Sequence, residues 1–222
     1  MVLKTKGIVF RFTKFGESSI IVTIFTEQFG LQSYIVDGVR SKTSRSKIAL
    51  FQPLTLLDMV VYHRENANIN RIKEVKCLHP YQSLQGDIIK SSVAMFIGEV
   101  INKSVKEESH ASHLFEFLCS SLITLDTLID NTENFHLVFL IKLSRFLGFG
   151  AQSSAELLGG RVTSSANETL ITQLLQADYL QPFKMQTDQR REILDLLINF
   201  YNEHGGVLGD LKSMQVLRDI MK

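Results

Sequence analysis

The run Ser19-Ile20-Ile21-Val22-Thr23-Ile24-Phe25-Thr26 decides the fold class of the first third of the chain. Its β-branched residues favour an extended strand, and the run is apolar enough for the centre of a sheet. Glu27-Gln28-Phe29-Gly30 follows as a turn, and Leu31–Val36 returns as the next strand. The glycine suits such a turn because it adopts a positive φ without steric cost. We therefore expect an antiparallel hairpin over residues 19–36.

Further strand patterns lie on both sides of this hairpin. Alternating residues predict a strand at Leu3–Phe12, which a polar break at Thr13–Glu17 ends, and two more runs follow at Leu54–Tyr62 and Ile69–Leu78. No helical pattern of any length lies among these five strands. A short five-stranded chain favours a closed or nearly closed barrel, because closure removes most exposed strand edges. Periodicity alone fits either an OB-fold or an SH3-like barrel.

From about Pro80 the apolar residues recur at three- and four-residue spacings, which is the period of amphipathic helices. Ala151–Asn167 is the one loop-like stretch, and Gly205-Gly206 separates the last two helices. We therefore predict two domains, a barrel in residues 1–80 and an α-helical domain in residues 81–222. The predicted helices are Ser83–Lys106, His113–Ile129, Glu133–Phe146, Glu168–Gln176, Asp188–His204 and Leu211–Met221.

The charge of the chain is distributed unevenly between these two parts. The 222 residues carry a formal net charge of +1, but the first 80 contain 12 basic and 6 acidic residues, a net +6. The remaining residues contain 12 basic and 17 acidic residues, a net −5. A basic first third predicts contact with a polyanion.

Other features exclude several classes of protein. No apolar run approaches the ~18 residues of a membrane span, and the N-terminus lacks a signal-peptide pattern, so we expect a cytoplasmic protein. Cys77 and Cys119 form no motif and are expected to be reduced. The sequence has no phosphate-binding GxxxxGK[ST] loop, no HExxH and no GxSxG. We therefore expect no enzymatic activity, no cofactor and no metal.

The segment Gly38–Lys47 is the strongest candidate for a binding site. Its four basic residues alternate with small hydroxyl residues, and it contains no acidic residue. Lys and Arg neutralise phosphates, while Ser and Thr hydroxyls donate hydrogen bonds to phosphate oxygens. A merely solvated loop is the alternative interpretation. The predicted phosphate-binding residues, which are DNA-binding residues if the polyanion is DNA, are Arg40, Lys42, Arg45 and Lys47, extended by Lys4, Lys6, Arg11 and Lys14 if the first strand lies beside the loop.

The order of several short segments resembles the bacterial recombination mediator family RecO. In the N-terminal half, the resemblance rests on five segments: Gly7-Ile8-Val9, Phe15-Gly16-Glu17-Ser18-Ser19, Phe25-Thr26-Glu27-Gln28-Phe29-Gly30, Gly38-Val39-Arg40-Ser41 and Leu50-Phe51-Gln52-Pro53-Leu54. The second half matches through Arg145-Phe146-Leu147-Gly148-Phe149 and through residues 191–217. Each segment is weak alone, but their order and spacing cover nearly the whole chain.

The resemblance implies an N-terminal OB-fold barrel followed by an all-α domain. It also implies binding of single- and double-stranded DNA and annealing of complementary strands. The implied partners are RecR and the acidic C-terminal tail of single-stranded-DNA-binding protein. The implied function is to help load RecA onto single strands coated by that protein. Two alternatives stay open on the residues alone: an RNA-binding OB-fold protein, and a protein-binding adaptor without direct DNA contact.

Two expectations concern the helical domain. Many members of the family carry a four-cysteine zinc site after the Leu-Gly-Phe segment, but residues 150–180 contain no cysteine or histidine, so we predict no zinc. For the acidic tail of single-stranded-DNA-binding protein, Lys142 and Arg145 combine cations with apolar neighbours. The alternative for these two residues is the exposed basic edge of a core helix.

Overall fold

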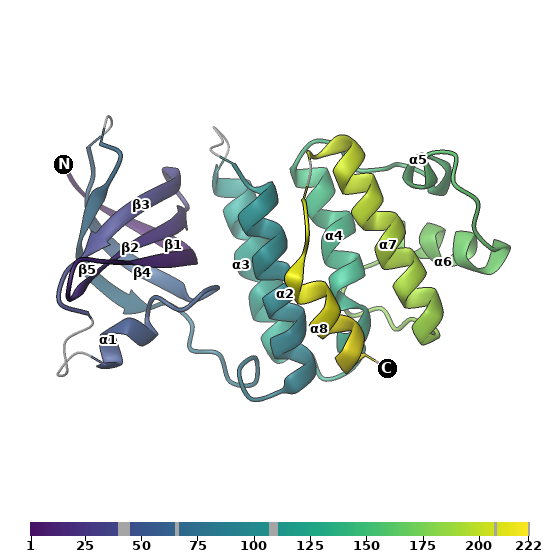
Figure 1. The fold of residues 1–222 in the computed structure, drawn as a ribbon, viewed down its shortest axis with the longest axis horizontal. Helices are drawn as coiled ribbons and strands as arrows, with labels where there is room; N and C mark the ends of the chain where they lie inside the picture. The colour runs from purple at the N-terminus through teal and green to yellow at the C-terminus, as the bar shows by residue number, and fades with distance from the viewer. Residues whose placement is uncertain (40–44, 65–66, 107–110, 207, 222) are drawn as a thin grey trace. The chain divides into compact units, whose positions relative to one another are not determined.

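The computed structural model describes residues 1–39, 45–64, 67–106, 111–206 and 208–221 (Figure 1). Five strands close into a barrel in the order β1-β2-β3-β5-β4. Strands β3 and β5 pair in parallel, and all other pairs are antiparallel. The strands are β1 (Val2–Phe15), β2 (Ser19–Thr26), β3 (Gly30–Val36), β4 (Leu56–Tyr62) and β5 (Asn70–Cys77).

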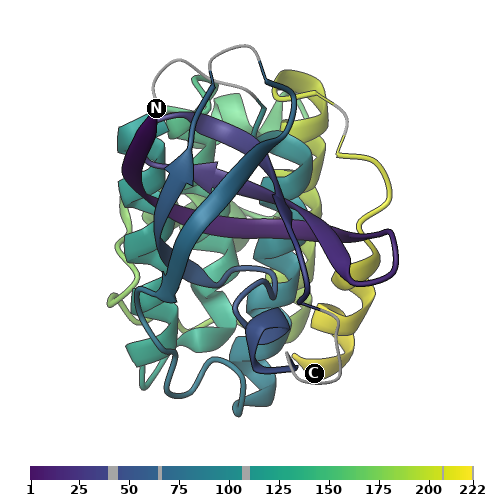
Figure 2. The ribbon, with the colours of Figure 1, turned by 90° about the vertical axis from the view of Figure 1, so that its left-hand side faces the viewer.

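This closed strand order, with the short helix α1 (Arg45–Ala49) between β3 and β4, is an OB-fold. The predicted fold class, a five-stranded barrel followed by helices, is confirmed. Figure 2 shows the strands crossing obliquely in the barrel wall, with the β1–β2 hairpin reaching beyond the other strands.

Two local predictions in the barrel were wrong. The polar stretch after Phe12 does not end β1, because Thr13 and Lys14 still pair with Ile21 and Ile20 of β2. The segment between β3 and β4 is not entirely a loop, because residues 45–49 form α1. A single helical turn is too short to show a helical period in sequence.

The barrel interior is filled by apolar side chains from all parts of the wall. Gly7 faces this interior, where a Cβ would lie 2.5 Å from Ile24 Cγ2 and 2.7 Å from Met59 Cε. Only glycine therefore fits there without displacing the core. The buried core consists of Val9, Ile20, Val22, Ile24, Tyr34, Val39, Phe51, Leu57, Met59 and Val61.

A second buried layer lies outside the wall, because Ile8, Phe10 and Phe25 alternate with the inward residues and are still fully buried. The rings of Phe10 and Phe25 stack with centroids 5.7 Å apart.

The contact pattern groups Met1–Tyr81 with Val105–Ile123 as one compact unit, and Gln82–Ser104 with Thr124–Lys222 as the other. The division into domains at residue 80 stays a prediction.

The helical part of the chain contains seven helices among the described residues, together with a short 3-10 turn at Thr132–Asn134. The stretch predicted as a loop, 151–167, contains one of them, α5, which Ser153 caps by accepting a hydrogen bond from the Glu156 N–H. The helices are α2 (Ile88–Ser104), α3 (Ala111–Thr127), α4 (Phe135–Phe146), α5 (Ser154–Leu158), α6 (Ser165–Gln176), α7 (Thr187–His204) and α8 (Lys212–Ile220).

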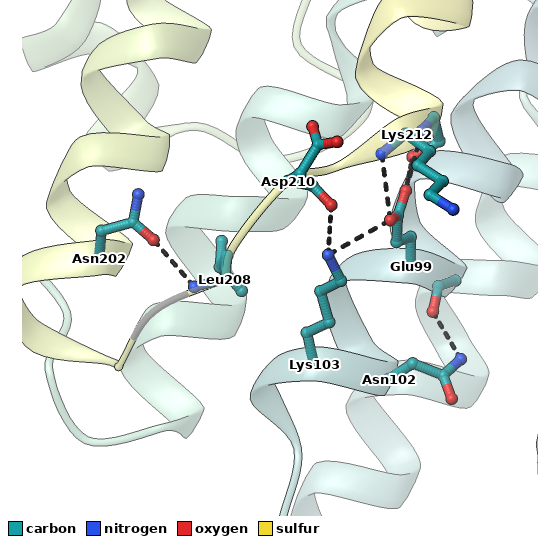
Figure 3. A network of polar contacts seen from close by, with 9 residues as sticks. Glu99, Asn102, Lys103, Asn202, Leu208, Asp210 and Lys212 are labelled. Atoms are coloured by element: carbon teal, nitrogen blue, oxygen red, sulfur yellow. Dashed lines mark hydrogen bonds and ion pairs between the residues drawn. The ribbon is translucent and has the colours of Figure 1, made fainter.

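Helix α8 is fixed to α2 by the carboxylate of Glu99 (Figure 3). This carboxylate accepts the backbone N–H groups of Lys212 at 3.1 Å and of Ser213 at 2.8 Å, and the Ser213 hydroxyl at 2.6 Å. Lys103 bridges Glu99 and the Asp210 carbonyl. The side chain of α2 thus supplies the N-terminal cap that the apolar Leu211 cannot provide.

A buried polar cluster fixes the segment that leads into α2. Asp126 is 2% exposed, and its carboxylate accepts the backbone N–H groups of Gln82, Ser83 and Leu84 at 2.8–3.1 Å. The ammonium of Lys90 donates to the Ser83 hydroxyl and to the Asp126 carbonyl, both at 2.7 Å. These bonds satisfy groups that would otherwise be costly to bury.

Candidate nucleic-acid interface

The basic segment predicted from sequence is only partly within the described residues. Arg40 and Lys42 lie outside them. Arg45 begins α1, and Lys47 is exposed in the same helix. The role of these four residues in DNA binding stays a prediction.

Three of the four predicted cations of β1, Lys6, Arg11 and Lys14, lie in different surroundings. Lys6 makes an ion pair with Glu27 at 3.0 Å, and this hydrogen bond and the Glu27 charge raise the pKa of Lys6. Arg11 lies opposite Thr23 beside a bulge in β1, and Lys14 lies opposite Ile20 near the end of the strand. Both are exposed, and neither makes an ion pair within the part of the chain that the structure describes. Their charges are therefore available to an anionic ligand.

The pairing register places Arg11 on a face formed mainly by hydroxyl and isoleucine side chains. Residues opposite one another in adjacent strands point to the same side of a sheet. Arg11 therefore shares the outer face of β1, β2 and β3 with Thr23 and Ser33. The next row on this face contains Thr13, Ile21, Ile35 and Arg71.

This outer face, which we call the β2–β3 face, has the chemistry that a nucleic-acid strand requires. Hydroxyl groups donate to phosphate oxygens, guanidinium groups neutralise them, and exposed apolar side chains contact bases. In OB-folds this surface, with the loops between strands 1 and 2 and between strands 4 and 5, binds oligonucleotides and oligosaccharides.

A different group of charged residues lies where β1, β4 and β5 meet, and no local sequence pattern predicts its ion pairs. Asp58 is paired with Lys4 at 3.6 Å and with Lys76 at 3.2 Å. Burial acts to raise the pKa of the Asp58 carboxyl, but the hydrogen bonds and charges of the two lysines hold it below its usual value. The pairing of Lys4 within the barrel leaves it less available to DNA than Arg11.

Lys142 and Arg145, predicted for the acidic tail, both make contacts within the helical unit. Lys142 pairs with Asp178 at 3.4 Å and lies 5.4 Å from the centre of the Tyr179 ring. The guanidinium of Arg145 donates to the Leu175 carbonyl. The structure thus brings Arg145 to the last turn of α6 and Lys142 to the segment that follows it, and tail binding there stays a prediction.

The region 150–180, for which the sequence predicts no zinc, is held in place by contacts between protein groups. Helices α5 and α6 occupy it, and Arg161 after α5 makes a two-bond ion pair with Glu203 of α7. Within the described residues, no three His, Cys, Asp or Glu side chains gather as a metal site. No helix in the same residues is both long and apolar enough to cross a membrane.

Comparisons with known proteins agree with this architecture. The family model "Recombination protein O N terminal" matches residues 1–81, and "Recombination protein O C terminal" matches residues 85–168. The DNA repair protein RecO of Flavobacterium psychrophilum is 36% identical, that of Flavobacterium johnsoniae 35%, and that of Bacteroides fragilis 33%. Each match covers 99% of this chain and 99% of the relative. The chain therefore belongs to the RecO family of DNA repair proteins.

Proposed function

We propose that the chain is a DNA repair and recombination mediator that binds single- and double-stranded DNA through its barrel. It promotes annealing of complementary strands and, with RecR, helps load RecA onto single strands coated by single-stranded-DNA-binding protein. The observation that carries the proposal is the set of exposed cations Arg11, Lys14 and Lys47, which have no ion-pair partner in the described part of the chain. A DNA backbone is the polyanion that a DNA repair protein would meet.

The mechanism is electrostatic rather than chemical. Two complementary strands repel one another because each carries one negative charge per nucleotide. A surface that neutralises some phosphates on each strand releases counterions and lowers this repulsion. Hydroxyl groups of the β2–β3 face, such as those of Thr23 and Ser33, add directional bonds to phosphate oxygens without reading the base sequence.

The helical unit is proposed to hold the partner proteins. We keep Lys142 and Arg145 as the candidate contacts for the acidic tail of single-stranded-DNA-binding protein. An incoming carboxylate would have to replace Asp178 at Lys142, and the exchange is feasible because Asp178 is 74% exposed. Charge reversal at Lys142 should therefore weaken binding of a synthetic acidic tail peptide, and an unchanged affinity would exclude this site.

The direct test is fluorescence anisotropy with a labelled single-stranded oligonucleotide over a salt series. The wild type is compared with a variant in which Arg40, Lys42, Arg45 and Lys47 are replaced by alanine. We expect weaker binding and a log–log salt slope that is shallower by about 0.7 for each lost phosphate contact.

The same assay distinguishes the alternatives. Equal affinity of the wild type and the variant would place DNA contact elsewhere. Absence of DNA binding by the wild type at low salt would favour the adaptor, and tighter binding to RNA of the same sequence would favour an RNA-binding function. A second experiment follows annealing of two labelled complementary strands, which the wild type should accelerate and which the variant, because it keeps Arg11 and Lys14, should accelerate less.

A further inference from the structure

A cleft of about 380 Å³ lies at the end of the barrel where β4 leads into β5. Pockets for small organic ligands begin at about this size. The cleft is lined by Met1, Val2, Tyr62, His63, Arg64, Ala67, Ile69, Asn70 and Arg71.

Exposed apolar side chains gather around this cleft. The residues Met1, Val2, Tyr62 and Ile69 are 85%, 51%, 46% and 44% exposed, although each is large and apolar or aromatic. Single exposed apolar residues are common on soluble proteins, but a group of them around one hollow marks a binding site. Tyr62 is the only aromatic residue among these four and offers a flat surface to a ligand.

The described wall of the cleft is held in place by contacts that do not involve a ligand. Asn70 is 3% exposed, and its side chain accepts the Arg64 N–H at 3.0 Å and donates to Gln32 at 3.4 Å. The imidazole of His63 stacks on Phe29 with ring centroids 4.0 Å apart. The positions that flank Tyr62 are therefore fixed before any ligand binds.

Among the described residues that line the cleft, the charged groups are the N-terminal amine of Met1 and the guanidinium groups of Arg64 and Arg71, and all three are cationic. Arg64 makes no ion pair within the described residues. Arg71 pairs with Asp37 at 2.8 Å, but both side chains are more than half exposed, so this pair is weak and exchangeable. The cleft therefore combines an aromatic surface with two guanidinium groups, as in sites that bind a base and its flanking phosphates.

The pairing register connects the cleft to the β2–β3 face. Tyr62 lies opposite Arg71, Arg71 opposite Ile35, and Ile35 opposite Ile21, so all four share one row on the outer side of the barrel. A strand that follows this row from the β2–β3 face reaches the cleft. This continuity favours a nucleic acid over a separate acidic peptide.

We propose that the cleft binds one unpaired base of single-stranded DNA, stacked on the ring of Tyr62, with Arg64 and Arg71 on the flanking phosphates. This inference rests on the proposed DNA binding of the barrel and adds a subsite that duplex DNA cannot fill, because its bases are already stacked and paired. It gives the protein a preference for single strands that electrostatics alone would not provide.

The test compares two oligonucleotides of equal length, a thymidine oligomer and an abasic oligomer, in the anisotropy assay. Base stacking on an aromatic side chain contributes about 1–3 kcal/mol, which corresponds to a roughly 5- to 150-fold change in affinity. Tyr62→Ala should weaken thymidine-oligomer binding by this factor and leave abasic-oligomer binding unchanged. Tyr62→Phe should retain the base preference, and Phe146→Ala, which removes a similarly exposed aromatic from α4, should change neither.

The outcomes separate this inference from the proposed function. If the wild type binds both oligomers with equal affinity, or if Tyr62→Ala keeps the base preference, the base subsite is excluded while DNA binding stands. Retention of the base preference by Tyr62→Ala would also be expected if the cleft binds an acidic peptide. If the wild type binds neither oligomer at low salt, the proposed function fails as well. Replacing Arg64 and Arg71 by alanine should make the salt slope for both oligomers shallower by about 1.4.

Discussion

The carboxylate of Glu99 anchors α8, and we predict that Glu99→Ala lowers the free energy of unfolding of the helical part by about 2–3 kcal/mol. The carboxylate accepts two backbone N–H groups and one hydroxyl at 2.6–3.1 Å. Hydrogen bonds to a charged group contribute about 1.5–3 kcal/mol, and loss of a helix N-cap costs about 1–2 kcal/mol. Both figures describe the same contact and are therefore not added. The anchor also requires the ionised acid, and its hydrogen bonds from Ser213 and Lys212 lower the pKa of Glu99 although burial acts to raise it.

The assay is urea unfolding followed by circular dichroism, with Lys212→Ala as the matched control. Lys212 contributes only its backbone N–H to the anchor, so its side chain can be removed with a change within about 0.5 kcal/mol. Glu99→Gln keeps an acceptor oxygen without the charge and should give an intermediate loss. Equal unfolding midpoints for Glu99→Ala and Lys212→Ala would refute the reasoning, because α8 would then be held by apolar packing alone.

Three further predictions concern buried positions. Gly7→Ala should destabilise the barrel by about 1–3 kcal/mol, because the new Cβ would overlap Ile24, and an unchanged thermal midpoint would contradict the packing described above. Asp126→Ala should cost about 3–5 kcal/mol, because three backbone N–H groups lose their acceptor, and a loss below 1 kcal/mol in urea unfolding would exclude that role. Burial and the charge of Arg190 lower the pKa of His136 to about 3, although a backbone hydrogen bond at Glu133 opposes them. In the unfolded chain the pKa of His136 is about 6.5, so below this pH protons bind preferentially to the unfolded chain. The free energy of unfolding should therefore fall by about 2 kcal/mol from pH 6.5 to pH 5. A His136→Gln variant whose stability shows the wild-type pH dependence would refute this assignment.

The sequence was sufficient to predict the positions of strands whose residues strongly favour extended structure. The run at residues 19–26 coincides with β2, because its β-branched residues favour extension wherever the strand lies in the sheet. The end of β1 was missed because Thr13 and Lys14 are polar, although both pair with residues of β2. The five-residue helices α1 and α5 were missed because each is too short for a helical period.

The candidate interface depended more on pairing register than on residue type. Lys6 and Arg11 look alike in sequence, but only the β2–β3 hairpin brings Glu27 to Lys6. The partners of Asp58 come from strands far apart in the chain, and no local pattern predicts them. Tyr62 would have been assigned to the barrel core by its type, whereas its outward register leaves it 46% exposed.

The central claim is that Arg11 and Lys14, the exposed cations of β1 that make no ion pair within the described residues, bind the DNA backbone. The most direct test measures the salt dependence of single-stranded-DNA affinity for a double variant, Arg11→Ala with Lys14→Ala, against the matched double variant Lys4→Ala with Lys6→Ala on the same strand. We expect a slope shallower by about 1.4 for the first variant, since two phosphate contacts are lost, and by less than about 0.7 for the second, whose lysines are already paired with acids. Equal slopes for the first variant and the wild type would contradict it.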